Sequence, residues 1–231
     1  MIESAFPQRL IDGYEAFLGN RFAQEQQRFQ ELAETGQKPR IMLVGCCDSR
    51  VSPEVIFDMR PGELFVVRNV ANIMPPYKPN DDYHGTSAAL EFAVMGLRVE
   101  HIVVMGHGKC GGVRAYVDSE ADPYQRPLSP GDFIGKWMEL IAPAASTTPR
   151  HPNEDVGDYT ERLNQASIRQ TLANLLTFPC VKTLNERGRL HLHGAYFDVM
   201  TGRLRTLDPA TGEFTIVAAE AHAKALDRPR F

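Results

Sequence analysis

The stretch that decides the fold is Ile41-Met42-Leu43-Val44-Gly45, which runs directly into Cys46-Cys47-Asp48-Ser49-Arg50. A continuous apolar run that ends in glycine and polar residues is typical of a central parallel strand, buried on both faces and followed by a turn. Two similar runs follow, at residues 64–67 after the turn signal Pro61-Gly62-Glu63, and at residues 102–106 after a helix-like stretch from Thr86 to Leu97. The alternation of strands and helices predicts a parallel sheet with right-handed crossovers.

The rest of the chain completes this sheet. Residues 190–197 predict a fourth strand, and Thr201-Gly202 predicts a hairpin turn into an antiparallel edge strand at residues 204–207. Aromatic and leucine residues at helical spacing predict a helix from Arg9 to Glu34, and a second long helix is expected from Tyr159 to Leu176. The stretch from Asp122 to Asp158 is rich in Pro, Gly and Ser and predicts an irregular excursion around a short apolar segment.

We therefore expect an α/β fold: a four-stranded parallel sheet with an antiparallel edge strand, flanked by helices, with an N-terminal helical extension. No repeat or linker divides the 231 residues, so a single domain is predicted over 1–231. Its parts are a helical arm at 1–40, an α/β core at 41–210 and a C-terminal extension at 211–231.

Composition narrows the function classes. The net charge is −4, and no Lys/Arg cluster provides the positive surface that phosphate binding needs, so nucleic acid is not expected as a partner. No apolar run approaches the roughly 18 residues that cross a bilayer, and neither a signal nor a transit peptide is visible. We expect a cytoplasmic protein without a membrane partner. Four cysteines are too few for a disulfide scaffold and fit core thiols or metal ligands.

The three candidate metal ligands lie where predicted strands end. Cys46 ends the first strand, whereas His107 and Cys110 lie in the Gly-rich stretch that ends the third. Because open α/β sheets place their sites at the carboxyl ends of strands, these side chains are expected to converge. Two thiolates and one imidazole suit Zn²⁺, and three protein ligands leave the fourth position open, as catalytic zinc sites do. The alternative is that each is a buried core residue at a strand end.

Asp48 and Arg50 stand beside the first candidate ligand. In the functional interpretation, Arg50 binds the Asp48 carboxylate, keeps it off the metal and leaves one oxygen to orient a metal-bound water. In the alternative, the two side chains only pair, while Ser52 and Pro53 begin the next helix.

These residues resemble the β-class carbonic anhydrases, whose signature is Cys-x-Asp-Ser-Arg followed about sixty residues later by His-x-x-Cys. The signature stands here at residues 46–50 and 107–110. The resemblance continues through residues 61–72 and 75–77 and covers about residues 8–210. The stretches 174–179 and 194–198 resemble the plant-type branch.

The resemblance implies one zinc per subunit at a subunit interface, and a homodimer or a higher even-numbered homo-oligomer. It also implies a substrate pocket for carbon dioxide or bicarbonate. The residues that match the plant-type pocket are Gln37, Phe65 and Val70, and Phe92 stands where that branch has a tyrosine. Core packing is the alternative role for the three apolar side chains.

The expected reaction is the reversible hydration of carbon dioxide to bicarbonate and a proton, by a zinc-bound hydroxide that Asp48 orients. The alternatives are a hydrolase of carbon disulfide or carbonyl sulfide on the same scaffold, a non-catalytic zinc- or bicarbonate-sensing module, and a redox or zinc-storage protein. Asp48, Arg50 and Gln37 together argue against the last two. Cys47 and Cys180 are interpreted as core thiols, and no role is assigned to His101, His151, His191, His193 or His222.

Overall fold

The computed structural model describes residues 6–80, 82–122, 124 and 126–217. The chain divides into two compact units, residues 1–38 and 39–231. Each is described by itself, and the expectation of one domain over the whole chain stays a prediction.

The first unit is helical, as predicted. It contains α1 (Gln8–Phe17), a π-helical turn η1 (Leu18–Phe22) and α2 (Ala23–Thr35). The helix α2 ends at Gly36, whose positive φ of 78° suits glycine. The rings of Phe17, Phe22 and Phe29 contact one another within the unit. None of the described residues of α1, η1 and α2 is buried, however, so this unit has aromatic surface but no core of its own.

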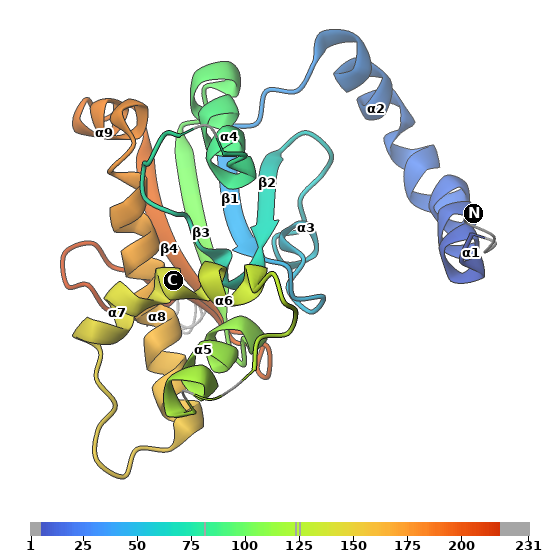
Figure 1. Ribbon diagram of the computed structural model, residues 1–231. Coiled ribbons are helices and arrows are strands. Elements are labelled where there is room, and N and C mark those ends of the chain that lie inside the picture. Colours follow the sequence, from blue (N-terminus) through green and yellow to red (C-terminus); the bar gives the residue numbers. More distant parts are fainter. Residues whose placement is uncertain (1–5, 81, 123, 125, 218–231) are drawn as a thin grey trace, which may run out of the picture. The chain divides into compact units, whose positions relative to one another are not determined.

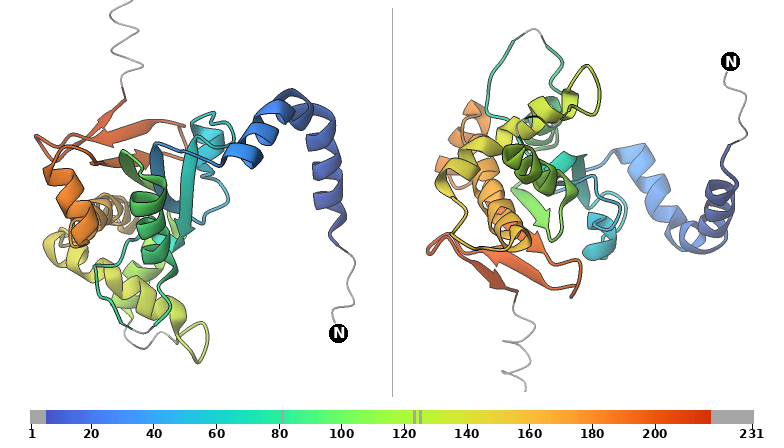
Figure 2. Two further views of the ribbon diagram at one scale, coloured as in Figure 1. Left: turned by 90° about the horizontal axis from the view of Figure 1, so that it is seen from above. Right: turned by 60° about the horizontal axis from the view of Figure 1, so that its bottom comes forward.

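The second unit is built on a six-stranded sheet (Figure 1). Its strands are β1 (Ile41–Cys46), β2 (Leu64–Asn69), β3 (His101–His107), β4 (His191–Phe197), β5 (Leu204–Leu207) and β6 (Phe214–Ile216), in the order β2-β1-β3-β4-β5-β6. The first four are parallel, and the last two pairings are antiparallel. The predicted fold class is thus confirmed, with one addition: β6, at the edge opposite β2 (Figure 2), lies where only a C-terminal extension was expected.

The strand β6 was not predicted from the sequence because it is short. Three residues are too few to show an alternation of apolar and polar side chains. Pairing with β5, which joins Leu207 to Phe214 and Arg205 to Ile216, gives this segment its strand conformation.

The connections between strands carry the helices. They are α3 (Pro53–Ile56), η2 (Val70–Asn72), α4 (Gly85–Glu91), η3 (Phe92–Leu97), α5 (Gly111–Ala121), α6 (Phe133–Met138), η4 (Glu139–Ile141), α7 (Ala142–Thr147), α8 (Val156–Leu175) and α9 (Pro179–Glu186). The predicted helix over 159–176 is confirmed as α8. The excursion over 122–158 is more ordered than expected, because it contains α6, η4 and α7. No helix among the described residues is long and apolar enough to cross a membrane.

The two faces of the sheet are packed differently. The main core lies on one face, where Met42, Ile102 and Val104 pack with Leu90 and Ile168 from the helices α4 and α8. On the other face a small cluster forms around Leu43, Met105 and Ala195. Since side chains alternate along a strand, the odd-numbered residues of β3 and β4 lie on this second face.

Candidate metal centre

Cys46, His107 and Cys110 come together at the carboxyl end of the sheet. Cys46 ends β1 and His107 ends β3, and these strands are neighbours. Cys110 is the N-cap residue, directly before α5. All three are buried, and one ligand atom from each lies within 4.8 Å of the others. Among the described residues, no other group of His, Cys, Asp and Glu side chains meets this spacing.

The ring of His107 is arranged to bind with one particular nitrogen. Its Nδ1 lies 3.0 Å from the carbonyl oxygen of Gly108, to which it donates. The proton on Nδ1 leaves the lone pair of Nε2 free. Nε2 is buried and has no hydrogen-bond partner among the described residues. A buried nitrogen without a partner is costly unless something binds it, and a metal ion at this position would do so.

The two sulfurs are spaced like ligands of one ion. Cys46 Sγ and Cys110 Sγ are 4.0 Å apart, whereas two sulfurs about 2.3 Å from a tetrahedral zinc ion lie about 3.8 Å apart. The pKa of Cys46 is lowered to about 4, and its contact with the Cys110 thiol is the largest cause. The same contact raises the pKa of Cys110. Without a cation, the negative charge of the Cys46 thiolate therefore makes ionisation of the Cys110 thiol unfavourable. A divalent cation would remove this repulsion.

The turn between His107 and Cys110 is held from α8. Lys109 has a positive φ of 56°, and its backbone N–H donates to Glu161 Oε1 at 2.9 Å. The side chain of Asn164, one helical turn further along α8, donates from Nδ2 to the carbonyl of His107 at 2.7 Å. Two hydrogen bonds from one helix thus fix the backbone on either side of the turn.

Gly106 allows α8 to come this close. A Cβ at this position would lie 2.7 Å from Asn164 Oδ1 and 2.7 Å from Ile168 Cδ1, so a side chain on this residue of β3 would push the helix away. The sequence analysis missed Glu161 and Asn164. Their only signal is a position on a long amphipathic helix, and the same is true of many residues that have no such contact.

Asp48 and Arg50 form a two-pronged pair beside the three ligands. Arg50 donates from Nε to Asp48 Oδ1 at 2.9 Å and from Nη2 to Oδ2 at 2.7 Å. These bonds hold the pKa of the Asp48 carboxyl well below its ordinary value. Asp48 Oδ2 lies 4.0 Å from His107 Nε2, so the carboxylate is close to the candidate metal position but is not one of the clustered ligands.

Arg50 also ties the two turns of the centre together. Its Nη2 donates to the carbonyl of Lys109 at 3.0 Å. The β1 turn and the β3 turn are therefore joined through one guanidinium. Arg68 on β2 supports the same region, because it donates to the carbonyl oxygens of Cys46 and Asp48.

The helix after this turn begins as expected, with Ser52 before α3 and Pro53 in its first position. The hydroxyl of Ser52 does not cap the helix backbone, however. It donates to Glu54 Oε2 at 3.0 Å.

The predicted substrate-pocket residues are found in different places. Val70 lies in η2 and packs with the apolar cluster that includes Cys46 and Cys110, and its carbonyl accepts from Trp137 Nε1 at 2.8 Å. Phe65 pairs in register with Met42. That position is four residues before Cys46, or about 13 Å back along the strand.

The remaining two predicted pocket residues, Phe92 and Gln37, lie in η3 and in the first unit. The ring of Phe92 contacts the ring of Phe65, with 5.9 Å between centroids, and Phe92 is 54% exposed. Gln37 belongs to the first unit and is exposed. The role expected for Gln37 stays a prediction.

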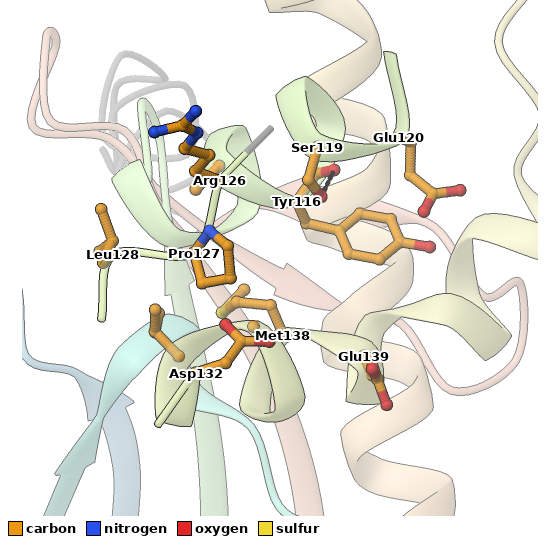
Figure 3. Close-up of a pocket in the computed structure, with 12 residues that line it drawn as sticks. Tyr116, Ser119, Glu120, Arg126, Pro127, Leu128, Asp132, Met138 and Glu139 are labelled. Atoms are coloured by element: carbon orange, nitrogen blue, oxygen red, sulfur yellow. Dashed lines mark hydrogen bonds between the residues drawn. The ribbon is translucent and has the colours of Figure 1, made fainter. Parts of the chain in front are cut away.

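A separate cavity of about 330 Å³ opens beside α5 and α6. Figure 3 shows Tyr116 and Met138 in it, together with the carboxylates of Glu120 and Glu139. None of the three clustered ligands lines this cavity, so it is not part of the centre.

The buried Cys₂His group at the strand ends, with an arginine-held aspartate beside it, makes this an α/β protein whose sheet edge could hold a metal ion. The family model described as carbonic anhydrase matches residues 41–204. The chain belongs to the carbonic anhydrase family.

Individual relatives agree and indicate the β class. The chain is 37% identical over 217 residues to a carbonic anhydrase from Pseudomonas aeruginosa, with 94% of each chain covered. Among solved structures, the β-carbonic anhydrase CcaA is 30% identical with a TM-score of 0.76, covering 90% of this chain and 91% of its own. A tetrameric β-carbonic anhydrase from Sordaria macrospora is 28% identical with a TM-score of 0.73, covering 90% and 98%. The predicted β-class membership and the expectation of an enzyme are confirmed.

Proposed function

We propose that this chain catalyses the reversible hydration of carbon dioxide to bicarbonate and a proton, with one zinc ion per subunit held by Cys46, His107 and Cys110. The observation that carries the proposal is the free Nε2 of His107, buried between two thiols at ligand spacing. When bound, zinc acidifies a coordinated water and so provides hydroxide near neutral pH.

The protein's own contribution is to orient that nucleophile. Asp48 is ionised and is held by Arg50, so its Oδ2 faces the ligand cluster as a hydrogen-bond acceptor at a fixed angle. An acceptor in this place directs the proton of the nucleophile toward Asp48 and leaves a lone pair for the carbon of the substrate. Arg50 also keeps the carboxylate from swinging onto the metal, because both of its oxygens are engaged.

We assign the substrate pocket to Gln37, Phe65, Val70 and Phe92. Val70 adjoins the ligands in its own chain, and apolar walls suit an uncharged linear molecule. Along β2, Phe65 lies about 13 Å before the position that pairs with Cys46 of β1. In a homodimer with its centres at the subunit interface, Phe65 and Phe92 would instead line the partner's pocket. The amide of Gln37 would donate to an oxygen of the substrate.

The assembly is proposed to be a homodimer or a higher even-numbered homo-oligomer. The first unit supports this, since its helices have exposed apolar side chains, with Leu10 56% and Tyr14 60% exposed. Exposed apolar patches of this kind mark interfaces. The Sordaria macrospora relatives are described as tetrameric.

Stopped-flow measurement of carbon dioxide hydration by the zinc-loaded protein tests the function. We expect turnover that is lost, together with zinc, in Cys46→Ala, His107→Ala and Cys110→Ala, while Cys180→Ala keeps both. Carbonyl sulfide and carbon disulfide are offered in parallel. Zinc-dependent hydrolysis of these two without carbon dioxide hydration would replace the proposed substrate. Full zinc content in any of the three ligand variants would overturn the metal site.

A further inference from the structure

Three histidines that the centre does not use gather at the opposite end of the sheet. His101 begins β3, while His191 and His193 lie on β4. His101 is directly opposite His191 in the register, and His193 is opposite Val103. The alternation of side chains places all three imidazoles on the same face of the sheet, away from α8. His107 lies six residues further along β3, about 20 Å away, so this cluster is separate from the Cys46–His107–Cys110 centre.

The rings of His101 and His193 are close enough to share one ligand, although the three histidines as they stand do not meet the ligand-atom spacing of the cysteine-containing centre. His101 Nδ1 and His193 Nε2 are 3.1 Å apart. The centroid of the His101 ring lies 5.4 Å from that of the His191 ring and 5.2 Å from that of the His193 ring. Two nitrogens that bind one metal ion at about 2.1 Å each, with angles between square and tetrahedral, lie roughly 3.0 to 3.4 Å apart. The separation of the first pair falls within this interval.

The third ring can reach the same point. His191 is exposed, and its ring is stacked on that of His101, so a change of its rotamer moves its nitrogens beside His101 without disturbing the buried core. It stands two residues from His193 on one strand, with both side chains on one face. His191 and His193 therefore approach the position next to His101 from the same side.

The surrounding charges suit a cation bound by neutral imidazoles. Burial, followed by the charges of His101 and His191, lowers the pKa of His193, which favours its neutral, ligating form. The carboxylate of Glu100 lies near these rings, and it pairs with Arg40. The β1 residue opposite His101 is the apolar Ile41. One carboxylate is too few for a hard cation such as Mg²⁺, which prefers oxygen ligands, whereas imidazole suits the ions of nickel, copper and zinc.

We propose that His101, His191 and His193 bind one divalent transition-metal ion at a second site, independent of the cysteine-containing centre. The proposal does not depend on the catalytic function assigned above. It assigns a role to three polar side chains at the amino ends of β3 and β4.

Calorimetric titration of nickel chloride into the zinc-loaded full chain tests the site. The protein carries no polyhistidine tag and has Cys47→Ser, because Cys47 is an exposed thiol. We expect one saturable equivalent of nickel at pH 7.5 and no release of zinc. His101→Asn and His193→Asn should each weaken this binding more than about tenfold, since a lost ligand costs at least as much as a lost outer partner. The matched control His151→Asn removes an exposed histidine outside the cluster and should leave binding unchanged.

A second measurement needs no variant that changes the cluster. In NMR spectra of the zinc-loaded wild-type protein, one equivalent of paramagnetic nickel should selectively broaden three of the histidine ring resonances. Broadening of all exposed histidines alike, the absence of a saturable equivalent, zinc release in step with nickel uptake, or equal binding by His193→Asn would each overturn the proposal.

Discussion

At the scale of single residues, the roles of the side chains in the candidate metal centre depend on which of their atoms already form hydrogen bonds within the protein. His107 donates from Nδ1 to a backbone carbonyl and keeps Nε2 free. Asp48 gives both carboxylate oxygens to Arg50. The first residue is thus prepared to bind a metal, and the second is restrained from doing so. This difference supports the ligand and orienting roles proposed for these two side chains, whose Nε2 and Oδ2 atoms are 4.0 Å apart.

The roles can be separated by Asp48→Asn. This variant should retain zinc, because no clustered ligand changes, but its carbon dioxide hydration should fall by about 10- to 100-fold because the acceptor loses its charge. Metal analysis and stopped-flow kinetics on the same sample provide the check. Ser49→Ala, an exposed neighbour, is the matched control and should behave as wild type. Loss of zinc from Asp48→Asn would show that the carboxylate is a ligand.

At the scale of elements, α8 acts as the support of the metal-binding turn. It packs over β3, where Gly106 leaves room, and its side chains accept from Lys109 and donate to the carbonyl of His107. The turn is therefore ordered by a helix that begins nearly fifty residues later in the chain.

Substitution of Glu161 tests this support. Glu161→Ala leaves the backbone N–H of Lys109 without its acceptor and should speed the loss of zinc to a chelator by about tenfold or more. Glu161→Gln retains an acceptor oxygen and should restore most of the difference. Asp158→Ala, on the exposed first turn of α8, is the control. Equal rates in Glu161→Ala and wild type would mean that the turn holds its shape without α8.

The loop before α8 predicts a pH dependence of stability. Hydrogen bonds from Arg162 lower the pKa of Glu154 from 4.5 to about 2. Because the folded state lowers this pKa, the ion pair contributes its full stability above about pH 4.5, and the contribution is lost as the pH falls toward 2. Wild type should therefore exceed Glu154→Gln in its free energy of unfolding at pH 7, and the gap should narrow at pH 3.

Urea unfolding at the two pH values measures this gap. The control is Glu186→Gln, which breaks an exposed pair with 4.0 Å between Lys182 Nζ and Glu186 Oε1 and should change stability very little. A gap that stays constant between pH 7 and pH 3 would contradict the assignment of Glu154.

At the scale of the whole molecule, we propose that the apolar side chains without a covering element lie at subunit interfaces. The helices of the first unit bury none of their described residues, and Phe65 and Phe92 lie along β2 and η3 rather than beside the ligands of their own chain. The proposed second copy of the chain would account for both observations.

Light scattering should accordingly give at least twice the chain mass of 25.8 kDa at micromolar concentration. Leu10→Glu and Tyr14→Glu should weaken association by about tenfold or more, because burying one large apolar side chain is worth roughly 1.5–3 kcal/mol. Glu34→Gln, an exposed change in α2, is the control. A monomeric mass for wild type would contradict the assembly and the shared pocket together.

Local sequence determined much of this protein. The apolar runs that became β1 to β4 were recognisable because strands buried on both faces need uninterrupted apolar side chains. The grouping of Cys46, His107 and Cys110 could be predicted because a parallel sheet brings the carboxyl ends of its strands to one edge. Their convergence follows from topology alone.

Only the tertiary structure decided the rest. The contacts of Glu161 with Lys109 depend on how closely α8 approaches β3, and the three-residue strand β6 exists because β5 offers it a partner. His101 lies at least ninety residues before His191 and His193 in sequence, and it meets them through the register of β3 with β4. Periodicity is a property of neighbouring residues, whereas register and helix packing are set by the fit of distant segments, and a single sequence contains no direct record of that fit.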